Sequence, residues 1–94
     1  MKTIHKHRLK VGDEPQKIKL SPEGVIRQVA YSPHDQHLYL WAEVPAGSLI
    51  ENSKTERCFR VFMTGDGIPD HAVFVGTALD SLRPESYHIF ELTE

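Results

Sequence analysis

Short segments rich in β-branched and aromatic residues recur along this chain, with turn-forming residues between them. The segments expected to form strands are 3–11, 17–20, 25–31, 38–44, 58–63, 73–79 and 87–92. No run of helical length repeats its apolar residues with a 3.6-residue period. Such spacing is typical of an antiparallel sandwich or small barrel. We therefore expect an all-β fold of about seven short strands, with one short helix or helical turn as an alternative within 45–56 or 80–86.

The segment 38–44 alternates most clearly. Its apolar face carries Leu38, Leu40, Ala42 and Val44 and is assigned to the core, while Tyr39 and Trp41 fall on the other face. Two large aromatic rings are costly to leave in water, so another layer, another subunit or a ligand is expected to cover them. The sequence leaves these three alternatives open.

The turn residues predict how neighbouring strands connect. The polar turn 12–15 is expected to join the first two strands in a hairpin, whose outward lysines suit a water-exposed edge. The segment 21–24 is interpreted as a turn with Gly24 at a positive φ, and a helix start is the alternative. We expect a long hairpin loop at 45–56 and a central hairpin around 64–71.

Length and charge limit the class of protein. Ninety-four residues fit one domain, 1–94, and a core of this size would gain stability from oligomerisation. The net charge of −2 argues against a duplex-DNA-binding protein. Cys58 is the only cysteine, which excludes an internal disulfide and suits a reducing compartment. With no signal-peptide pattern and no membrane-length apolar run, the expected location is the cytoplasm.

The connector 64–71, TGDGIPDH, is the best candidate for a site in this sequence. Gly65 and its neighbours could aim several backbone N–H groups at one phosphate or carboxylate. Asp66 would repel such an anion unless Arg57 or Arg60 lay close. The competing interpretation is structural, with TGDG as a hairpin turn.

Catalytic and metal-binding patterns are incomplete. Asp66 or Asp70 could pair with His71 as orienter and base of a hydrolase, but the chain has no nucleophile elbow, and Cys58 lies inside an expected strand. We therefore expect no enzyme and no cofactor. Two histidine pairs, His5 with His7 and His34 with His37, lack the converging third or fourth ligand that a stable metal site needs, so no metal is expected.

Basic residues gather in the first two strands: Lys2, Lys6, Arg8, Lys10, Lys17 and Lys19. Basic and aromatic side chains that interleave on a small β-barrel can bind single-stranded nucleic acid. Here Tyr39 and Trp41 are far from these lysines in the sequence. Nucleic acid is therefore not the expected partner.

The chain resembles a group of short phage and prophage proteins of unknown function. The segments that carry the resemblance are MKTIHKHRL, LWAEV, FRVFMTGDGIPD, FVGTA and HIFEL, in this order. The resemblance implies a phage origin, a small accessory role in the host bacterial cytoplasm, and a host protein or small nucleotide as a partner. It brings no assigned active site.

These observations predict a small, phage-type, non-enzymatic binding module that self-associates as a homo-oligomer. Its expected contact aromatics are Tyr39, Trp41 and Phe62. The alternative is a binder of a small anionic or nucleotide ligand at 64–71, using Arg60, Gly65, Asp66, Asp70 and His71. No membrane partner is expected.

Overall fold

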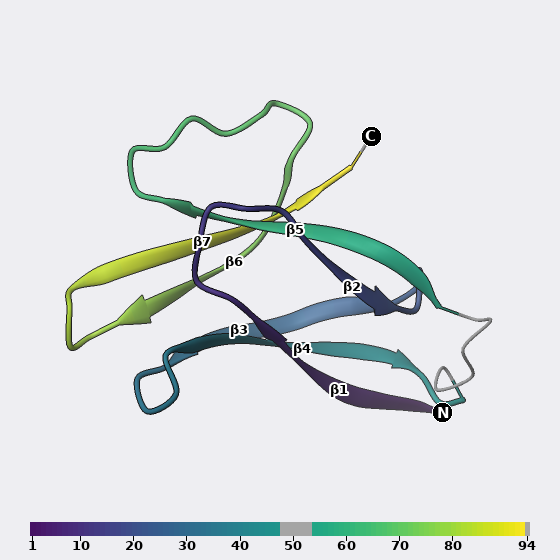
Figure 1. The fold of residues 1–94 in the computed structure, drawn as a ribbon. Coiled ribbons are helices and arrows are strands. Elements are labelled where there is room, and N and C mark those ends of the chain that lie inside the picture. Colours follow the sequence, from purple (N-terminus) through teal and green to yellow (C-terminus); the bar gives the residue numbers. More distant parts are fainter. Residues whose placement is uncertain (48–53, 94) are drawn as a thin grey trace.

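The computed structural model describes residues 1–47 and 54–93, which form seven strands and no helix. The strands are β1 (Lys2–Leu9), β2 (Gln16–Leu20), β3 (Val25–Ser32), β4 (His37–Pro45), β5 (Thr55–Met63), β6 (Val73–Asp80) and β7 (Glu85–Leu92). They make two antiparallel sheets, a three-stranded one ordered β1-β4-β3 and a four-stranded one ordered β2-β5-β7-β6. The two sheets lie as separate layers in Figure 1. The expected all-β sandwich is confirmed.

The core lies between the sheets and follows from the alternation of the strands. Leu38, Leu40, Ala42 and Val44 of β4 are all buried, as expected. The opposite sheet contributes Phe59 and Val61 from β5 and Tyr87 and Ile89 from β7, which pack in the same cluster. Each strand therefore presents one apolar face to the other sheet, which removes that surface from water.

The predicted hairpin of the first two strands is wrong. β1 pairs with β4, whereas β2 pairs with β5 in the other sheet. The segment 10–15 carries the chain between the sheets, and the Gln16 side-chain amide bridges it by accepting from the Lys10 N–H and donating to the Lys10 carbonyl, both at 2.7 Å. Both strands are nevertheless edge strands of their sheets. Their outward lysines therefore lie where charge discourages pairing with the strands of other chains.

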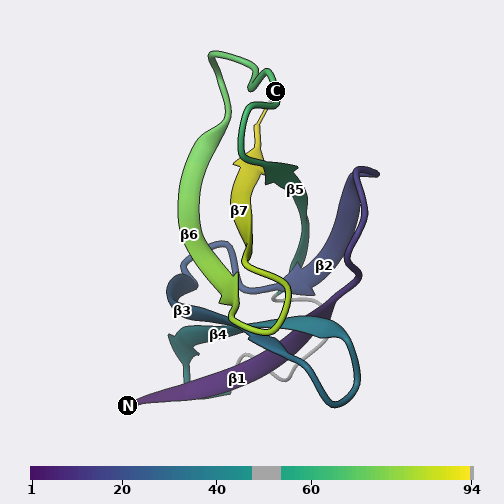
Figure 2. The same ribbon diagram turned by 90° about the vertical axis from the view of Figure 1, so that its left-hand side faces the viewer.

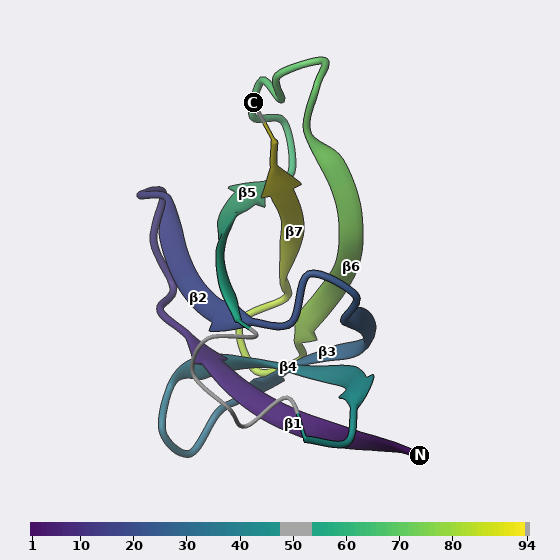
Figure 3. The ribbon, with the colours of Figure 1, turned by 90° about the vertical axis from the view of Figure 1, so that its right-hand side faces the viewer.

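The predicted central hairpin at 64–71 is also wrong. β7 lies between β5 and β6 and is antiparallel to both, so β5 and β6 run in the same direction. The segment 64–72 must therefore return along the sheet, and Figure 1 shows it on the side away from the three-stranded sheet. Figures 2 and 3 show the same segment near the C-terminus, far from the N-terminus.

The connection at 45–56 differs from the sequence-based expectation, whereas the connection at 80–86 is the expected turn. The 45–56 segment was expected to close a hairpin, but it joins β4 of one sheet to β5 of the other. The alternative of a short helix in this segment falls largely on residues 48–53, which lie outside the described residues. The alternative helix at 80–86 does not form, because β6 reaches Asp80 and β7 starts at Glu85.

The segment 21–24 is a turn, as the sequence favoured, and the alternative of a helix start is wrong. The Gly24 N–H donates to the Ser21 carbonyl at 2.9 Å. Gly24 is not among the glycines with positive φ, which are Gly47 and Gly65. Its small size matters for another reason: a Cβ atom there would lie 2.8 Å from the Leu20 side chain.

Candidate binding surfaces

The outer face of the three-stranded sheet joins aromatic and basic side chains. Register places Lys6 opposite Trp41 and Arg8 opposite Tyr39. The Lys6 ammonium lies 4.1 Å from the centroid of the Tyr39 ring and 5.7 Å from that of Trp41. Both rings are half-buried. The lysine from the neighbouring strand covers part of the aromatic surface that was expected to be shielded from water.

The pairing of β1 with β4 brings the aromatic residues next to the basic ones, although the two groups are far apart in the sequence. Tyr39 and Trp41 are separated from Lys6 by more than thirty positions in the printed sequence, yet the pairing of β1 with β4 makes them neighbours. Local sequence pattern carries no information about which strands pair at long range. The lysine pattern predicted a basic edge, and only the register shows that this edge borders the aromatic rings.

Two carboxylates, Asp35 and Glu43, lie at opposite ends of this face and are paired with neighbouring side chains. The Tyr39 hydroxyl donates to the Asp35 carboxylate, which raises the pKa of Tyr39 and lowers the pKa of Asp35. At the other end, hydrogen bonds from Arg27 and then Lys2 lower the pKa of the Glu43 carboxyl, at 3.2 and 3.3 Å. These carboxylates are therefore already paired.

The outer face of the four-stranded sheet carries a row of aromatic rings. The Phe62 and Phe90 ring centroids are 5.5 Å apart, and those of Phe90 and Phe74 are 5.4 Å apart, both in edge-to-face geometry. Phe62 is fully buried, whereas Phe74 is 58% exposed. The row thus runs from a covered end on β5 to an open end on β6.

Arg60 helps to cover the buried end of this row. Its guanidinium carbon lies 4.6 Å from the Phe62 ring centroid. The Arg60 Nε is buried and makes no hydrogen bond among the described residues. Phe62, an expected contact aromatic, is therefore enclosed by its own chain. It also lies on the opposite side of the sandwich from Tyr39 and Trp41, so the three rings do not form one surface.

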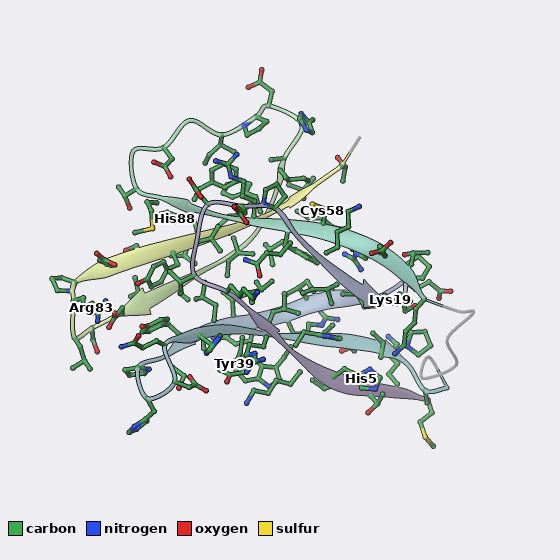
Figure 4. The ribbon with its side chains drawn as sticks, viewed as in Figure 1. His5, Lys19, Tyr39, Cys58, Arg83 and His88 are labelled. Atoms are coloured by element: carbon green, nitrogen blue, oxygen red, sulfur yellow. The ribbon has the colours of Figure 1, made fainter. Side chains whose placement is uncertain are left out.

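The β6–β7 half of this outer face has no charged side chain at its outward positions. They are Phe74, Thr77 and Leu79 on β6, and Ser86, His88, Phe90 and Leu92 on β7. The hydroxyls of Thr64 and Thr77 hydrogen-bond the two His88 ring nitrogens, at 2.9 and 3.1 Å. Figure 4 shows His88 and Tyr39 on opposite sides of the molecule. We call this set of seven residues the β6–β7 strip.

The connector 64–71 forms a closed turn at its start. The Asp66 N–H donates to the Met63 carbonyl at 3.0 Å, and the Asp66 carboxylate accepts from the Met63 N–H at 2.9 Å. Gly65 occupies the third position of this turn with φ of +97°, which glycine adopts at low cost. Gly65 and Asp66 thus have a structural role in the turn.

The cations proposed to help an anion at 64–71 have other partners. Arg57 forms a fork with both carboxylate oxygens of Glu91, each at 2.7 Å. It also donates to the carbonyls of Ser21 and Gly24. Hydrogen bonding to Glu91 raises the pKa of Arg57. Arg57 therefore ties β5 to β7 and to the 21–24 turn, and Arg60 lies on Phe62.

Asp70 and His71 are exposed at the far end of the connector. The structure gives no hydrogen bond between their side chains within residues 1–47 and 54–93. The His71 carbonyl accepts from the Thr93 hydroxyl at 3.2 Å, and the Ala72 N–H closes a turn on the Pro69 carbonyl at 3.0 Å. These contacts hold the backbone of the connector beside the C-terminal end of β7.

The histidine pairs do not gather further ligands in the described part of the chain, where no three His, Cys, Asp or Glu side chains come together to hold a metal. His5 and His7 share the inward face of β1, because they pair with Ala42 and Leu40 of the core. Burial, and then the nearby charges of His5 and Lys54, lower the pKa of His7. Cys58 is free and partly buried.

Comparison with known proteins gives a family and no activity. No curated protein and no solved structure matches this chain. Among the described residues there is no helix able to cross a membrane. A family model described as "Domain of unknown function (DUF7352)" matches residues 1–94, so the chain belongs to this family.

Proposed function

We propose that the protein is a non-enzymatic binding module that self-associates through the β6–β7 strip. The observation that carries this proposal is the absence of Asp, Glu, Lys and Arg from the seven outward positions of the strip, in a chain of which these four residue types make up 26%. Phe74 and Leu79 within it are 58% and 69% exposed. A contiguous, uncharged and partly aromatic surface is the kind that proteins bury against a partner.

A second copy of this chain is the partner that fits the strip best. A twofold axis apposes the same patch on two subunits, so any charge in the patch would face a like charge near the axis. The strip avoids most of that repulsion because six of its seven residues have uncharged side chains, and both ring nitrogens of the seventh, His88, are hydrogen-bonded. A domain of this length also gains stability from the apolar area that a dimer buries.

Light scattering coupled to gel filtration tests the proposal. The parent protein is expected to elute as an oligomer, and Phe74→Lys and Leu79→Lys are expected to dissociate it. Val25→Lys is the matched control, because Val25 is 45% exposed on β3 and pairs with Glu43, so a lysine there is tolerated. A parent that stays monomeric across the concentration range would sink the proposal, as would equal dissociation by Val25→Lys.

The Tyr39–Trp41 face is proposed as the contact for a different partner. It lies on the opposite sheet from the strip, so self-association leaves it accessible. Lys6 and Arg8 beside the rings favour a partner with acidic groups. Trp41 is the only tryptophan, so its fluorescence would respond to binding. Trp41→Ala is expected to abolish capture of such a partner without changing the oligomeric state.

The setting proposed for this module is the cytoplasm of a phage-infected bacterium. The resemblance to short phage and prophage proteins supports the origin, and the single cysteine suits a reducing compartment. Fractionation of a host cell that expresses the tagged chain checks the location. Recovery in the periplasmic or membrane fraction would contradict it.

A further inference from the structure

A hollow of about 280 Å³ opens at the end of the sandwich that carries the β6–β7 turn, and no residue of the β6–β7 strip or of the 64–71 connector lines it. Three separate segments meet there: Lys10 and Val11 after β1, Gln36 and His37 at the start of β4, and Arg83 in the β6–β7 turn. Figure 4 shows Arg83 at the left end of the molecule, where Figure 1 also shows the β3–β4 turn. Tyr31 and Tyr87 complete the lining.

The lining of this hollow is basic, although the whole chain carries a net charge of −2. Lys10 and Arg83 are cationic, and no acidic residue lines the hollow. The His37 Nδ1–H donates to the Asp35 carbonyl at 2.7 Å, which leaves Nε2 for another partner. Two cations from separate segments that share one concave surface attract an anion more strongly than the same charges spread over a face.

Acidic residues of the nearby β6–β7 turn have other partners. The Asp80 carboxylate accepts from the Leu82 N–H at 3.1 Å, and the Glu85 carboxylate accepts from the Tyr87 hydroxyl at 3.0 Å. Neither lines the hollow. No ion pair joins the Arg83 guanidinium to either carboxylate among the described residues. Its planar fork matches two oxygens of a phosphate group.

Two tyrosine rings form the inner wall. The Tyr31 and Tyr87 centroids are 5.2 Å apart with an interplanar angle of 34°. Tyr87 is buried in the core, and this burial raises its pKa to about 12, so its ring is a fixed neutral wall near pH 7. Tyr31 is half-buried. A flat organic group attached to the anion would find an aromatic surface here.

We propose that this hollow binds a small organic phosphate, with Arg83, Lys10 and His37 around the phosphate group and the Tyr31 ring beside the organic part. Its volume is close to the lower limit of roughly 300 Å³ for ligand pockets, which favours a ligand of mononucleotide size over a dinucleotide. The site is distinct from the 64–71 connector, and it does not depend on self-association.

Calorimetric titration with AMP, using the full chain, tests this site. AMP is expected to bind, inorganic phosphate to compete with it, and adenosine, which lacks the phosphate, to fail to compete. Arg83→Gln is expected to weaken AMP binding by about tenfold or more, because a charge-assisted fork is lost. Lys10→Gln is expected to weaken it as well, by removing one point charge.

Arg27→Gln is the matched control, because it removes the same charge from an exposed arginine on β3 that lies outside this hollow. It should leave AMP affinity unchanged. Amide shifts on AMP addition should concentrate at Lys10, His37 and Arg83. Undetectable AMP binding, no competition by phosphate, or equal losses in Arg83→Gln and Arg27→Gln would overturn the proposal. Arg83 and Lys10 are exposed, so their variants are expected to fold, which circular dichroism checks.

Discussion

The ammonium of Lys6 lies over the ring of Tyr39, 4.1 Å from its centroid, and the same ammonium is 5.7 Å from the centroid of Trp41. One lysine from the edge strand β1 thus borders both aromatic side chains that β4 presents outside the core. The contact links the basic edge to the aromatic face. We therefore expect the Lys6 ammonium to affect both the stability of the fold and the environment of Trp41.

Replacing Lys6 with methionine keeps an apolar stem and removes the charge. We expect Lys6→Met to lower the free energy of unfolding by about 0.5–1 kcal/mol, the usual value of an exposed cation–π contact. The emission spectrum of Trp41, the only tryptophan, should shift. Urea unfolding followed by fluorescence measures both. Lys17→Met, an exposed lysine on β2, is the control, and equal effects of the two variants would contradict the assignment.

Arg57 should matter far more than Arg27, although both arginines pair with a glutamate. The Arg57 side chain is 17% exposed and makes a fork with Glu91, whereas that of Arg27 is 55% exposed at its contact with Glu43. Arg57→Ala removes the Arg57 donor from the partly buried Glu91 carboxylate and from the Gly24 carbonyl, whereas the Ser21 carbonyl keeps the Gly24 N–H. We expect a loss of about 2–3 kcal/mol for Arg57→Ala and about 0–1 kcal/mol for Arg27→Ala. Chemical denaturation compares them, and similar losses would disprove the structural role of Arg57.

Gly76 allows β6 to approach β3 of the other sheet. A Cβ atom at Gly76 would lie 2.7 Å from the Val29 Cγ2 atom. Because Val29 is buried, we expect Gly76→Ala to cost about 1–3 kcal/mol through overpacking. Gly67→Ala, where nothing lies within 4 Å, should be nearly neutral.

A double-mutant cycle separates this steric contact from the general cost of replacing a strand glycine. In the Val29→Ala background the obstructing methyl groups are gone, so Gly76→Ala should cost much less than in the parent. Thermal unfolding of the four proteins measures the coupling. Additive effects would show that the close approach of β6 to β3 is not what constrains Gly76.

His7 should make the protein less stable as the pH falls below neutrality. Burial lowers the pKa of His7 from its ordinary value of 6.5, and its Nε2 is buried without a hydrogen-bond partner in the described residues. The unfolded chain therefore takes up the proton at a higher pH than the folded chain does. Stability from neutral His7 is fully present above the unfolded pKa and is lost as the pH falls from there through the lower folded pKa.

The measurement is the free energy of unfolding between pH 7.5 and pH 5.5, a range of about one unit on either side of the ordinary histidine pKa. His7→Leu is expected to flatten this dependence, because leucine cannot take up a proton. His34→Gln, which changes an exposed histidine, should leave it unaltered. If His7→Leu retained the full pH dependence, other groups would be responsible.

The local sequence predicted which segments form strands and which side chains they bury. Alternation alone assigned Leu38 and Val44 to the core, because successive side chains of a strand point to opposite faces. The turn at 21–24 also followed from local residues. The candidate site at 64–71 was recognised as a connector, although its role as a hairpin turn was wrong.

Strand pairing was decided only by the tertiary structure. β1 pairs with β4 and not with β2, and β7 lies between β5 and β6. Alternation of apolar and polar residues predicts which face of the sheet a side chain lies on. It does not predict which strand lies alongside, because apolar burial is non-directional. The contacts of Lys6 with Tyr39 and the meeting of Lys10, His37 and Arg83 both depend on this long-range pairing. The sequence therefore determined the strands and their faces, while the packing of two sheets decided which residues share a surface.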